Sequence, residues 1–340
     1  MLGRVYSQLL CKQLTYFVEK RLQNFRKHVI LTVGLKLSEG EHPMAYHILF
    51  NPFAGNGRCA KDCKLAESFL TDGTCCYTDM TKILDYGMFF AGMDATDTLV
   101  LCGGDGTLNR FINDTKHIAL PERILYFATG SGNDFLHDIG GTPLEKPVEI
   151  GQYLKGLPTV TVKGKQYRVL NGVGYGIDGY CCEVGDKQRA SSDKPVNYTF
   201  IAIKGLLFHY KPTNATVTVD GVTHTFDHVW LAPTMHGRFY GGGMMPTPTQ
   251  NRLNTEGSIS TMVYRANSKL QALMTFPLIF KGTHVEKKKI VTILTGREVT
   301  VCFDRPTALQ IDGETILDVS EYTMRTAAEN SANAAREMVS

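Results

Sequence analysis

The sequence predicts a Rossmann-like α/β domain with a mainly parallel sheet, followed by an antiparallel β-sandwich. With 340 residues and 43% hydrophobic composition, the chain is long enough to bury two moderate cores. From Tyr46 to about Pro143, short apolar runs end in glycine-rich turns and precede helix-compatible sequence, which is typical of βα units. Beyond Pro143, polar and apolar residues alternate around turns such as Asp220-Gly221, which favours antiparallel hairpins.

The apolar runs give the expected elements. In the first domain we expect strands at 47–50, 98–102 and 124–128. In the second we expect one helix, at 197–208, among strands at 160–162, 167–170, 215–219, 222–226, 229–232, 259–264, 290–294, 299–303 and 308–311. The α/β domain should therefore span 44–143 and the sandwich 144–318, and the segment 319–327 could return to the first domain.

The first 43 residues differ from the rest of the chain. Their apolar residues recur at helical spacing, with lysines and arginines between them, as in a basic amphipathic helix. Such a helix could pack on the body of the protein or lie on an anionic membrane. It could also be no part of the native protein, since Met44 directly precedes the first expected strand.

Composition excludes several classes of protein. The 36 Lys+Arg and 33 Asp+Glu residues are too balanced for a nucleic-acid-binding protein, which usually has a strongly basic face. No stretch approaches the roughly 20 apolar residues of a membrane span, and the start of the chain does not fit a signal peptide. The nine cysteines show no CxxC pair, which favours reduced thiols in the cytoplasm.

The most informative segment is the loop Gly103-Gly104-Asp105-Gly106-Thr107, which follows an apolar strand and opens a helix. Glycines let the backbone approach a phosphate closely, and the start of a helix adds partial positive charge. A carboxylate such as Asp105 is repelled by polyphosphate unless it holds a metal ion, orients a cation or accepts a proton, so it indicates catalysis. The alternative is an ordinary tight turn in which Asp105 caps the helix.

Two further small-residue loops follow strands, at Asn51 to Arg58 and at Gly130 to Phe135. Three such loops at neighbouring strand ends favour a phosphate-binding cradle over three unrelated turns. The sequence GxxxxGK[ST] is missing, so the cradle is not a P-loop. Arg58 could pair with phosphate oxygens, although it could equally be an exposed arginine at a helix start.

These three loops resemble the signature loops of the diacylglycerol kinase catalytic domain family, which is related to sphingosine and ceramide kinases. The resemblance runs from about Ala45 to about Thr323 and includes Asn171 to Asp178, Gly241 to Gly243 with Pro248, and Asp312-Gly313-Glu314. It implies the fold of NAD kinases and diacylglycerol kinases, with an N-terminal nucleotide-binding domain and a C-terminal lipid-substrate domain. ATP and Mg2+ would be the cofactors, with the nucleotide between the two domains.

The resemblance also implies roles for individual residues. Glu314 would be the general base that takes the proton from the lipid hydroxyl, while Asp105 and Asp312 would orient metal or serve as alternative bases. The Asp312-Gly313 pair could also be an ordinary hairpin turn, as Asp220-Gly221 should be. Asp134 and Asp178 would contact the lipid substrate, although Asp178 could instead cap a helix. The nucleotide contacts would come from Asn51, Gly55, Gly57, Arg58, Thr78, Gly103, Gly104, Asp105, Gly106, Thr107, Leu108, Asn109, Gly130, Ser131, Asn133 and Asp134.

Two departures from the family pattern concern metal and nucleotide. Bacterial members hold a structural Mg2+ with an Asp-Gly pair, whereas this chain has Glu256-Gly257 about two residues later. By the resemblance, the matching metal ligands would be Leu253, Glu256 and Ser258, and the longer carboxylate puts this site in question. Ser131 stands where threonine is usual, which keeps the hydroxyl.

The resulting expectation is an ATP-dependent kinase of diacylglycerol or a related lipid, in the cytoplasm and peripheral at the inner membrane face. Apolar residues around 206–210 and 274–280 could line an acyl pocket, with Lys281 and Lys287 to Lys289 on lipid headgroups. Most such residues could also be core and solvated charge. A NAD kinase-like enzyme with a soluble acceptor and a non-catalytic lipid or nucleotide sensor are the alternatives, and a homodimer is left open.

Overall fold

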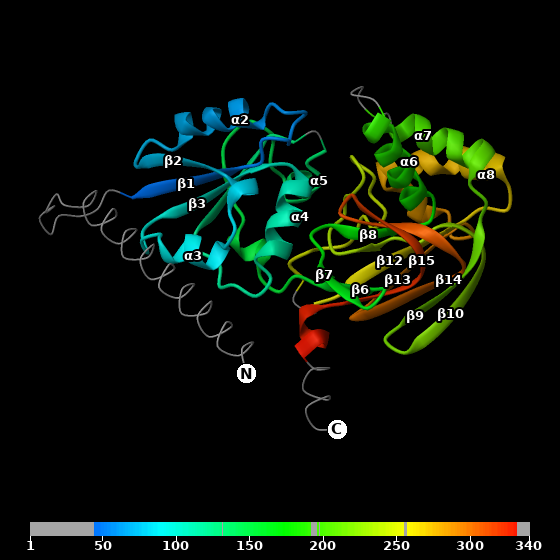
Figure 1. The fold of residues 1–340 in the computed structure, drawn as a ribbon. Helices are drawn as coiled ribbons and strands as arrows, with labels where there is room; N and C mark the ends of the chain where they lie inside the picture. Colours follow the sequence, from blue (N-terminus) through cyan, green and yellow to red (C-terminus); the bar gives the residue numbers. More distant parts are fainter. Residues whose placement is uncertain (1–43, 131, 192–195, 197, 255–256, 332–340) are drawn as a thin grey trace, which may run out of the picture. The chain divides into compact units, whose positions relative to one another are not determined.

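A computed structural model describes residues 44–130, 132–191, 196, 198–254 and 257–331. The extension predicted over 1–43 lies outside these described residues. Two sheets, one of five strands and one of ten, organise the described chain (Figure 1). Within the described residues, no helix is long and apolar enough to span a membrane.

The first sheet has the strand order β2-β1-β3-β4-β5. Its strands are β1 (Ala45–Phe50), β2 (Thr74–Asp79), β3 (Thr98–Gly103), β4 (Ile124–Ala128) and β5 (Val148–Glu149). The first four are parallel, and β5 runs antiparallel to β4. The carboxyl ends of β1, β3 and β4 therefore share one edge, where parallel sheets bind ligands.

Short helices cover both faces of this sheet. They are α2 (Cys59–Asp62), η1 (Cys63–Phe69), η2 (Met80–Lys82), α3 (Tyr86–Ala91), α4 (Asp105–Asp114) and α5 (Asp134–Asp138). Successive residues of a strand point to opposite faces, so Leu49 packs into one apolar core and Ile48 into another. Burial on both faces explains why β3 and β4 are apolar almost throughout.

The second sheet has the order β7-β6-β15-β14-β8-β11-β12-β10-β9, and β13 pairs with β12. Its strands are β6 (Thr159–Val162), β7 (Lys165–Arg168), β8 (Gly172–Tyr175), β9 (Thr213–Val219), β10 (Val222–Leu231), β11 (Thr234–Met235), β12 (Ile259–Arg265), β13 (Val291–Gly296), β14 (Glu298–Ile311) and β15 (Glu314–Arg325). Strand β14 changes partner along its length, from β9 at Val299 to Phe303 to β8 at Leu309 to Ile311. The sheet thus folds back on itself around a core of inward-facing residues.

A layer of helices covers one side of the second sheet (Figure 1). It consists of α6 (Ile177–Ser191), α7 (Tyr198–Lys204), η4 (Gly205–His209), α8 (Lys269–Thr275), η5 (Phe276–Lys281) and η6 (Thr283–Glu286). A further η3 (Gly151–Leu154) follows β5. Apolar side chains between this layer and the sheet, such as Leu206, Trp230 and Ile279, form a separate core.

The predicted fold class is confirmed, with an α/β domain followed by an antiparallel domain. Two of the expected domain boundaries differ from the structure. Residues Val148–Glu149 belong to the first sheet, because they pair with β4, so that sheet continues beyond 143. Residues 319–325 do not return to the first sheet, because β15 continues to Arg325 between β14 and β6, which satisfies its backbone groups.

Candidate active site

The three strand-end loops pack backbone against backbone at the carboxyl edge of the first sheet. The amides of Thr129 and Gly130 donate to the carbonyl of Gly103, at 2.8 and 3.1 Å. A methyl group on Gly130 would lie 2.4 Å from the Cα of Gly104, and one on Gly55 would lie 2.5 Å from the carbonyl oxygen of Thr129. Only glycine fits at such contacts. The predicted convergence of the loops is therefore present.

The other side of these loops is open. A methyl group on Gly57 or Gly106 would meet no atom of the described chain within 4 Å, apart from the backbone of its own helix turn. The amides of Thr107 and Leu108 donate to the carbonyl of Gly104, which leaves those of Asp105 and Gly106 at the open end of α4. The helix dipole adds positive potential there, as an anionic ligand requires.

The remaining predicted nucleotide residues lie at or beneath the cradle. Leu108 is in the core, and the side chain of Thr107 packs against Gly103. Thr78 is half-buried near the end of β2, opposite Leu49. The structure does not describe Ser131. The others hold the loops: Asn51 accepts from the amide of Phe53, exposed Arg58 donates to the carbonyl of Gly55, and buried Asn133, with φ of 48°, donates to the carbonyl of Gly130.

Asp105 caps a helix, but not its own. Its carboxylate accepts the amides of Asp134 and Phe135, at 2.8 and 2.9 Å, at the start of α5. The N-cap residue of α4 is Gly104, which has no side chain to cap the helix. Asp105 also accepts from the amide group of Asn171, at 3.1 Å. Its charge thus joins two strand-end loops and the start of β8.

Asp134 links α5 to the glycine-rich segment of the second domain. Its two oxygens accept the amides of Gly242 and Gly243, each at 2.7 Å. Burial, and then the negative charge of Asp105, raises the pKa of Asp134 to about 7, while the two glycine amides oppose the shift. The carboxylate therefore stabilises the Gly241 to Gly243 turn.

Asp312 occupies the turn between β14 and β15, and all its hydrogen-bonding capacity is used. One oxygen accepts the amide of Leu170 and the side-chain amide of Asn109, at 2.7 and 2.9 Å. The other accepts the amides of Asn171 and Gly172, at 2.8 and 3.0 Å. Burial raises the pKa of Asp312, against these four donors. As Asn109 lies in α4, Asp312 fastens the hairpin to the helix that follows the Gly103-Gly104 turn.

The turn at Asp220-Gly221 provides an internal comparison. Both Asp220 and Asp312 have a φ of 48° and precede a glycine in a hairpin. The carboxylate of Asp220 accepts the amides of Arg297 and Glu298, each at 2.8 Å. Both aspartates therefore hold a neighbouring segment by its amides, and this role accounts for Asp312 without proton transfer or metal binding.

Asn171 joins the carboxylates into one network. It donates to Asp105 through its side chain and to Asp312 through its backbone amide, and its side-chain oxygen accepts from Arg252 at 3.0 Å. Its carbonyl accepts the amides of His236 and Gly237. A single asparagine thus links the start of α4, the β14–β15 turn and the segment after β11.

A buried ion pair completes the network. Arg252 is 2.5 Å from Asp138, and their side chains are only 3% and 4% exposed. Arg252 also donates to the carbonyl of Leu170 and lies over the ring of Phe135, at 4.7 Å. Arg238 pairs with the same aspartate at 2.7 Å. Sequence reasoning missed Arg252, Arg238 and Asp138, because no local pattern connects residues that are more than 90 positions apart.

Glu314 differs from these carboxylates because it is exposed. It is the first residue of β15 and pairs with Ile311 across the turn. Two residues of chain span at most about 7 Å, so Glu314 stays close to the point where Asp312 is held on α4. No hydrogen bond to its side chain occurs among the described residues, which leaves its carboxylate available.

Asp178 lies in the first turn of α6 and is buried. Its Oδ1 accepts the amide of Gly179 at 2.9 Å, whereas Oδ2 makes no hydrogen bond of good geometry among the described residues, although the side chains of Tyr240 and Gln310 lie beside the carboxylate and stabilise its charged form. A methyl group on Gly174 would lie 1.7 Å from that Oδ2. Burial raises the pKa of Asp178 to about 6. A buried carboxylate oxygen without a well-formed hydrogen bond costs free energy, so this oxygen has the capacity for one more donor.

The predicted structural metal site is only partly described. Glu256 lies outside the described residues, and Leu253 is exposed. The carbonyl of Ser258 accepts from the side chains of Gln250 and Asn254, at 2.8 and 3.0 Å, so both its lone pairs are taken. Within the described chain, no group of three or more His, Cys, Asp or Glu residues is arranged to hold a metal ion. Because Glu256 is not described, the metal site at Leu253, Glu256 and Ser258 stays a prediction.

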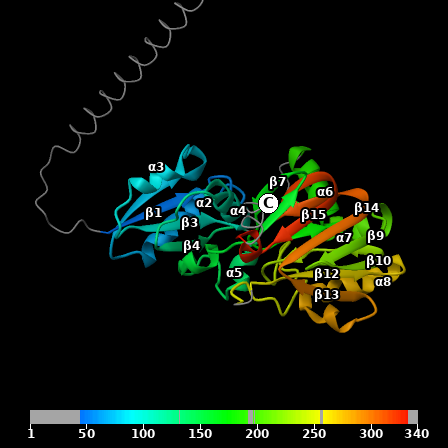
Figure 2. The same cartoon turned by 90° about the horizontal axis from the view of Figure 1, so that it is seen from below.

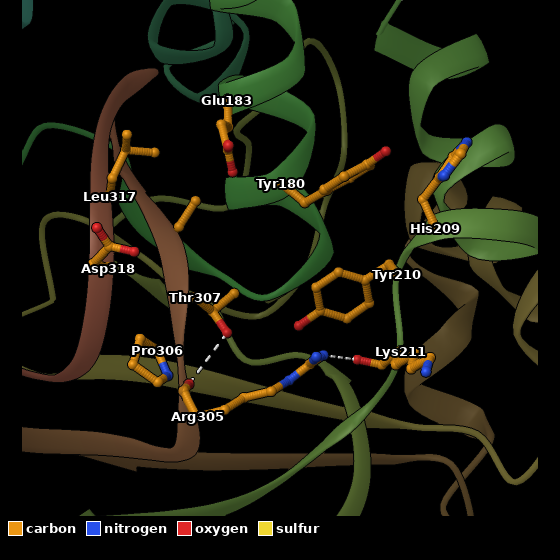
Figure 3. A pocket seen from close by; sticks show the side chains of 11 residues that line it. Tyr180, Glu183, His209, Tyr210, Lys211, Arg305, Pro306, Thr307, Leu317 and Asp318 are labelled. Carbon is orange, nitrogen blue, oxygen red and sulfur yellow. Dashed lines mark hydrogen bonds between the residues drawn. The ribbon is translucent and has the colours of Figure 1, made fainter.

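A cavity of about 260 Å3 lies elsewhere, in the second domain (Figure 3). Its walls include Glu183 and Asp318 on one side and Arg305, Lys211 and His209 on the other. The ring of Tyr210 stands between Arg305 and Tyr180, at 5.4 and 6.1 Å. Tyr210, from the predicted acyl-pocket residues, lines this cavity, but none of the predicted catalytic, nucleotide-binding or metal-binding residues does, so it is separate from the three strand-end loops.

Comparisons with known proteins agree with this geometry. Residues 45–162 match the diacylglycerol kinase catalytic domain, and residues 171–326 match the YegS C-terminal NAD kinase beta sandwich-like domain. The chain is 25% identical over 205 residues to a diacylglycerol kinase of Mycobacterium tuberculosis. The alignment covers 58% of this chain and 64% of the relative, so the chain spans less than two thirds of the relative's length. It is 22% identical over 236 residues to YtlR of Bacillus subtilis, named as a candidate lipid kinase, across 64% of this chain and 73% of that one.

A crystal structure of a diacylglycerol kinase from Bacillus anthracis has the same fold. Its TM-score is 0.56 at 18% identity, and the superposition covers 85% of this chain and 96% of that one. At this identity the likeness concerns the fold alone. Both domains of the described chain therefore follow the fold of that structure.

Two glycine substitutions should separate packing from ligand access. Gly130→Ala should lower the free energy of unfolding by about 1–3 kcal/mol, because its methyl group would collide with Gly104. Gly106→Ala should be neutral or stabilising by up to about 1 kcal/mol, because the site is open and helical. It should nevertheless weaken nucleotide binding. Urea unfolding measures the stability of each variant, and nucleotide titration measures binding. Equal stability of the two variants would contradict the close contact between Gly130 and Gly104.

Removal of Arg252 should leave a buried charge without its main partner. Arg252→Met should therefore lower the free energy of unfolding by about 3–5 kcal/mol. The matched control is Arg110→Met, which breaks the exposed pair with Asp114 and should cost less than about 0.5 kcal/mol. Thermal and urea unfolding measure the free energy of unfolding of both variants. A similar decrease in the two would contradict a large contribution of the buried Arg252–Asp138 pair to stability.

His236 should make the protein sensitive to acid. Burial, and then the charge of Arg252, lowers the pKa of His236 to about 3. The unfolded chain would bind a proton near pH 6.5 and the folded chain would not, so stability is lost as the pH falls below that value. At pH 5 this loss should reach about 2 kcal/mol. His236→Gln should remove it, whereas His117→Gln, at an exposed site, should leave the slope unchanged.

Proposed function

Because the chain belongs to the diacylglycerol kinase catalytic domain family, we propose that it transfers the terminal phosphate of ATP to the hydroxyl of diacylglycerol or a related membrane lipid. The observation that carries this proposal is the open cradle of the three strand-end loops, next to a hairpin with an available carboxylate. A kinase that uses ATP and a lipid meets both at the inner face of the cell membrane.

The cradle would bind the phosphates of ATP. The free amides at the start of α4 supply donors, and the helix dipole adds positive potential. Arg58 is exposed at the neighbouring loop and could reach a phosphate oxygen by leaving the carbonyl of Gly55. Mg2+ would enter with the nucleotide as part of the substrate, since Asp105 and Asp312 already accept three and four hydrogen bonds.

Glu314 would be the general base, and Asp312 a positioning residue. A base must be free to accept a proton and must lie close to the acceptor hydroxyl. Glu314 is free, while Asp312 holds its hairpin on α4 through Asn109. Phosphoryl transfer depends chiefly on such positioning and on charge stabilisation, so rigid attachment of the hairpin would contribute to rate.

Asp178 and Tyr240 would hold the polar end of the acceptor. Oδ2 of Asp178 and the hydroxyl of Tyr240 are buried beside each other without a hydrogen bond of good geometry in the described chain, so a lipid hydroxyl could bind to both. Asp134 would act indirectly, because both its oxygens hold the Gly242 and Gly243 amides. It would shape the substrate side of the site by fixing that turn.

Glu314→Gln should reduce kcat at least 100-fold and change nucleotide affinity less than about threefold. Glu321→Gln is the matched control, because it changes an exposed glutamate of the same strand and should leave kcat unaltered. The assay supplies ATP, Mg2+ and a panel of lipids, and identifies the phosphorylated product by mass.

Other results would redirect the assignment. Unchanged turnover in Glu314→Gln would exclude that residue as the base. A phosphorylated product that stays in the aqueous phase would favour a NAD kinase-like enzyme with a soluble acceptor. A chain that binds nucleotide or lipid without phosphorylating any acceptor would be a sensor that keeps the kinase fold.

A further inference from the structure

Five large apolar side chains of the helical layer are exposed. They belong to α7, η4, α8 and η5. Helices α7 and α8 lie near each other in two views (Figures 1 and 2), η4 directly follows α7, and η5 directly follows α8. Lys269 of α8 donates to the carbonyl of Leu207 in η4 at 2.7 Å. We call this the apolar-basic surface; its members and their exposed fractions are Ile203 (41%), Phe208 (71%), Leu270 (66%), Met274 (69%) and Phe280 (40%).

Core packing does not require these side chains. The same elements bury a different set, such as Leu206, Ala272 and Ile279, against the second sheet. Each element is therefore amphipathic, with one face in the core and a second apolar face outward. Single exposed apolar residues are common, but five of them on neighbouring elements indicate an interaction site.

Charge around the apolar side chains is almost entirely positive. Residues 198–211 and 268–289 contain seven lysines and one glutamate. The lysines are Lys204, Lys211, Lys269, Lys281, Lys287, Lys288 and Lys289, and the glutamate is Glu286. The whole chain has a net charge of only +3, so this concentration is local. Exposed apolar side chains among lysines are the composition of surfaces that lie on anionic lipid.

We propose that the apolar-basic surface docks the protein onto an anionic lipid bilayer. The apolar side chains would enter the boundary between headgroups and acyl chains, and the lysines would meet lipid phosphates. This deepens the proposed function by naming the surface through which the kinase reaches its lipid. A symmetric contact with a second copy is disfavoured, because it would bring the two sets of lysines together.

The position of this surface fits access to a lipid acceptor. Helix α6 carries Asp178 in its first turn and packs against α7 and η4. A methyl group on Gly205 of η4 would lie 2.8 Å from the ring of Tyr180, and one on Gly185 of α6 would lie 2.7 Å from that of Tyr198 in α7. Two elements of the apolar-basic surface, α7 and η4, therefore contact the helix that carries Asp178, the residue proposed to bind the lipid acceptor.

Sedimentation of the full chain with lipid vesicles, without nucleotide, tests the proposal. Vesicles of phosphatidylglycerol and phosphatidylcholine are compared with phosphatidylcholine alone. Leu270→Ser/Met274→Ser should lower the partition coefficient on the anionic vesicles about tenfold or more. The matched control is Leu84→Ser/Met88→Ser, an identical pair at the same spacing in the first domain, which is 101% and 76% exposed and should have no effect.

Charge reversal provides the second arm. Lys269→Glu/Lys281→Glu should lower binding to anionic vesicles by about fivefold for each lysine, with a weaker dependence on salt. Binding to phosphatidylcholine should change little. Thermal unfolding of all variants confirms that each is folded, and the residues 1–43 are present in every one, so any membrane affinity of that segment is shared.

The outcomes separate this inference from the proposed kinase activity. Loss of vesicle binding only in the surface variants supports docking, even if no lipid is phosphorylated and the kinase assignment fails. Equal binding by Leu270→Ser/Met274→Ser and its control would overturn docking, even if the protein phosphorylates dispersed short-chain lipid. A change of oligomeric state without a change in vesicle binding would assign the surface to a second copy and overturn the proposal as well.

Discussion

The architecture of this protein depends on aspartates that bind backbone and side-chain N–H groups rather than ligands. Asp105, Asp134 and Asp312 together hold α5, the Gly241 to Gly243 turn, the start of β8 and α4. Asn171 connects two of them and also reaches Arg252. A buried charge is costly unless its hydrogen bonds are satisfied, so these contacts stabilise one arrangement of the loops against others.

This arrangement divides positioning from chemistry. The carboxylates that look most catalytic in the sequence, Asp105 and Asp312, have their oxygens occupied by donors. The groups left with unused capacity are the exposed Glu314 and the buried pair of Asp178 and Tyr240. On our account, one set fixes the geometry of the cradle, and the other handles the proton and the lipid hydroxyl.

Much of the fold could be predicted because it follows local rules. Apolar runs that end in glycine-rich loops indicate βα units, and the loops at Gly55, Gly104 and Gly130 meet because parallel strands end at one edge. The roles of Asp138, Arg252 and Asn171 could not be predicted, since their partners are set by how distant segments pack. The turn at Asp312-Gly313 was visible in the sequence, but its four donors come from segments at 109 and 170–172. The limit at 143 missed β5, because a two-residue strand has no periodicity to detect.

The most direct test of the central claim is a crystal structure with Mg2+ and a non-hydrolysable ATP analogue. We expect the phosphates at the open face of the cradle, within hydrogen-bonding distance of the amides of Asp105 and Gly106, with Glu314 beside the terminal phosphate. Asp105 and Asp312 should keep the hydrogen bonds described above. A nucleotide bound in the cavity beside Tyr210, or one that displaces Asn171 from Asp105 and Asp312, would contradict the account.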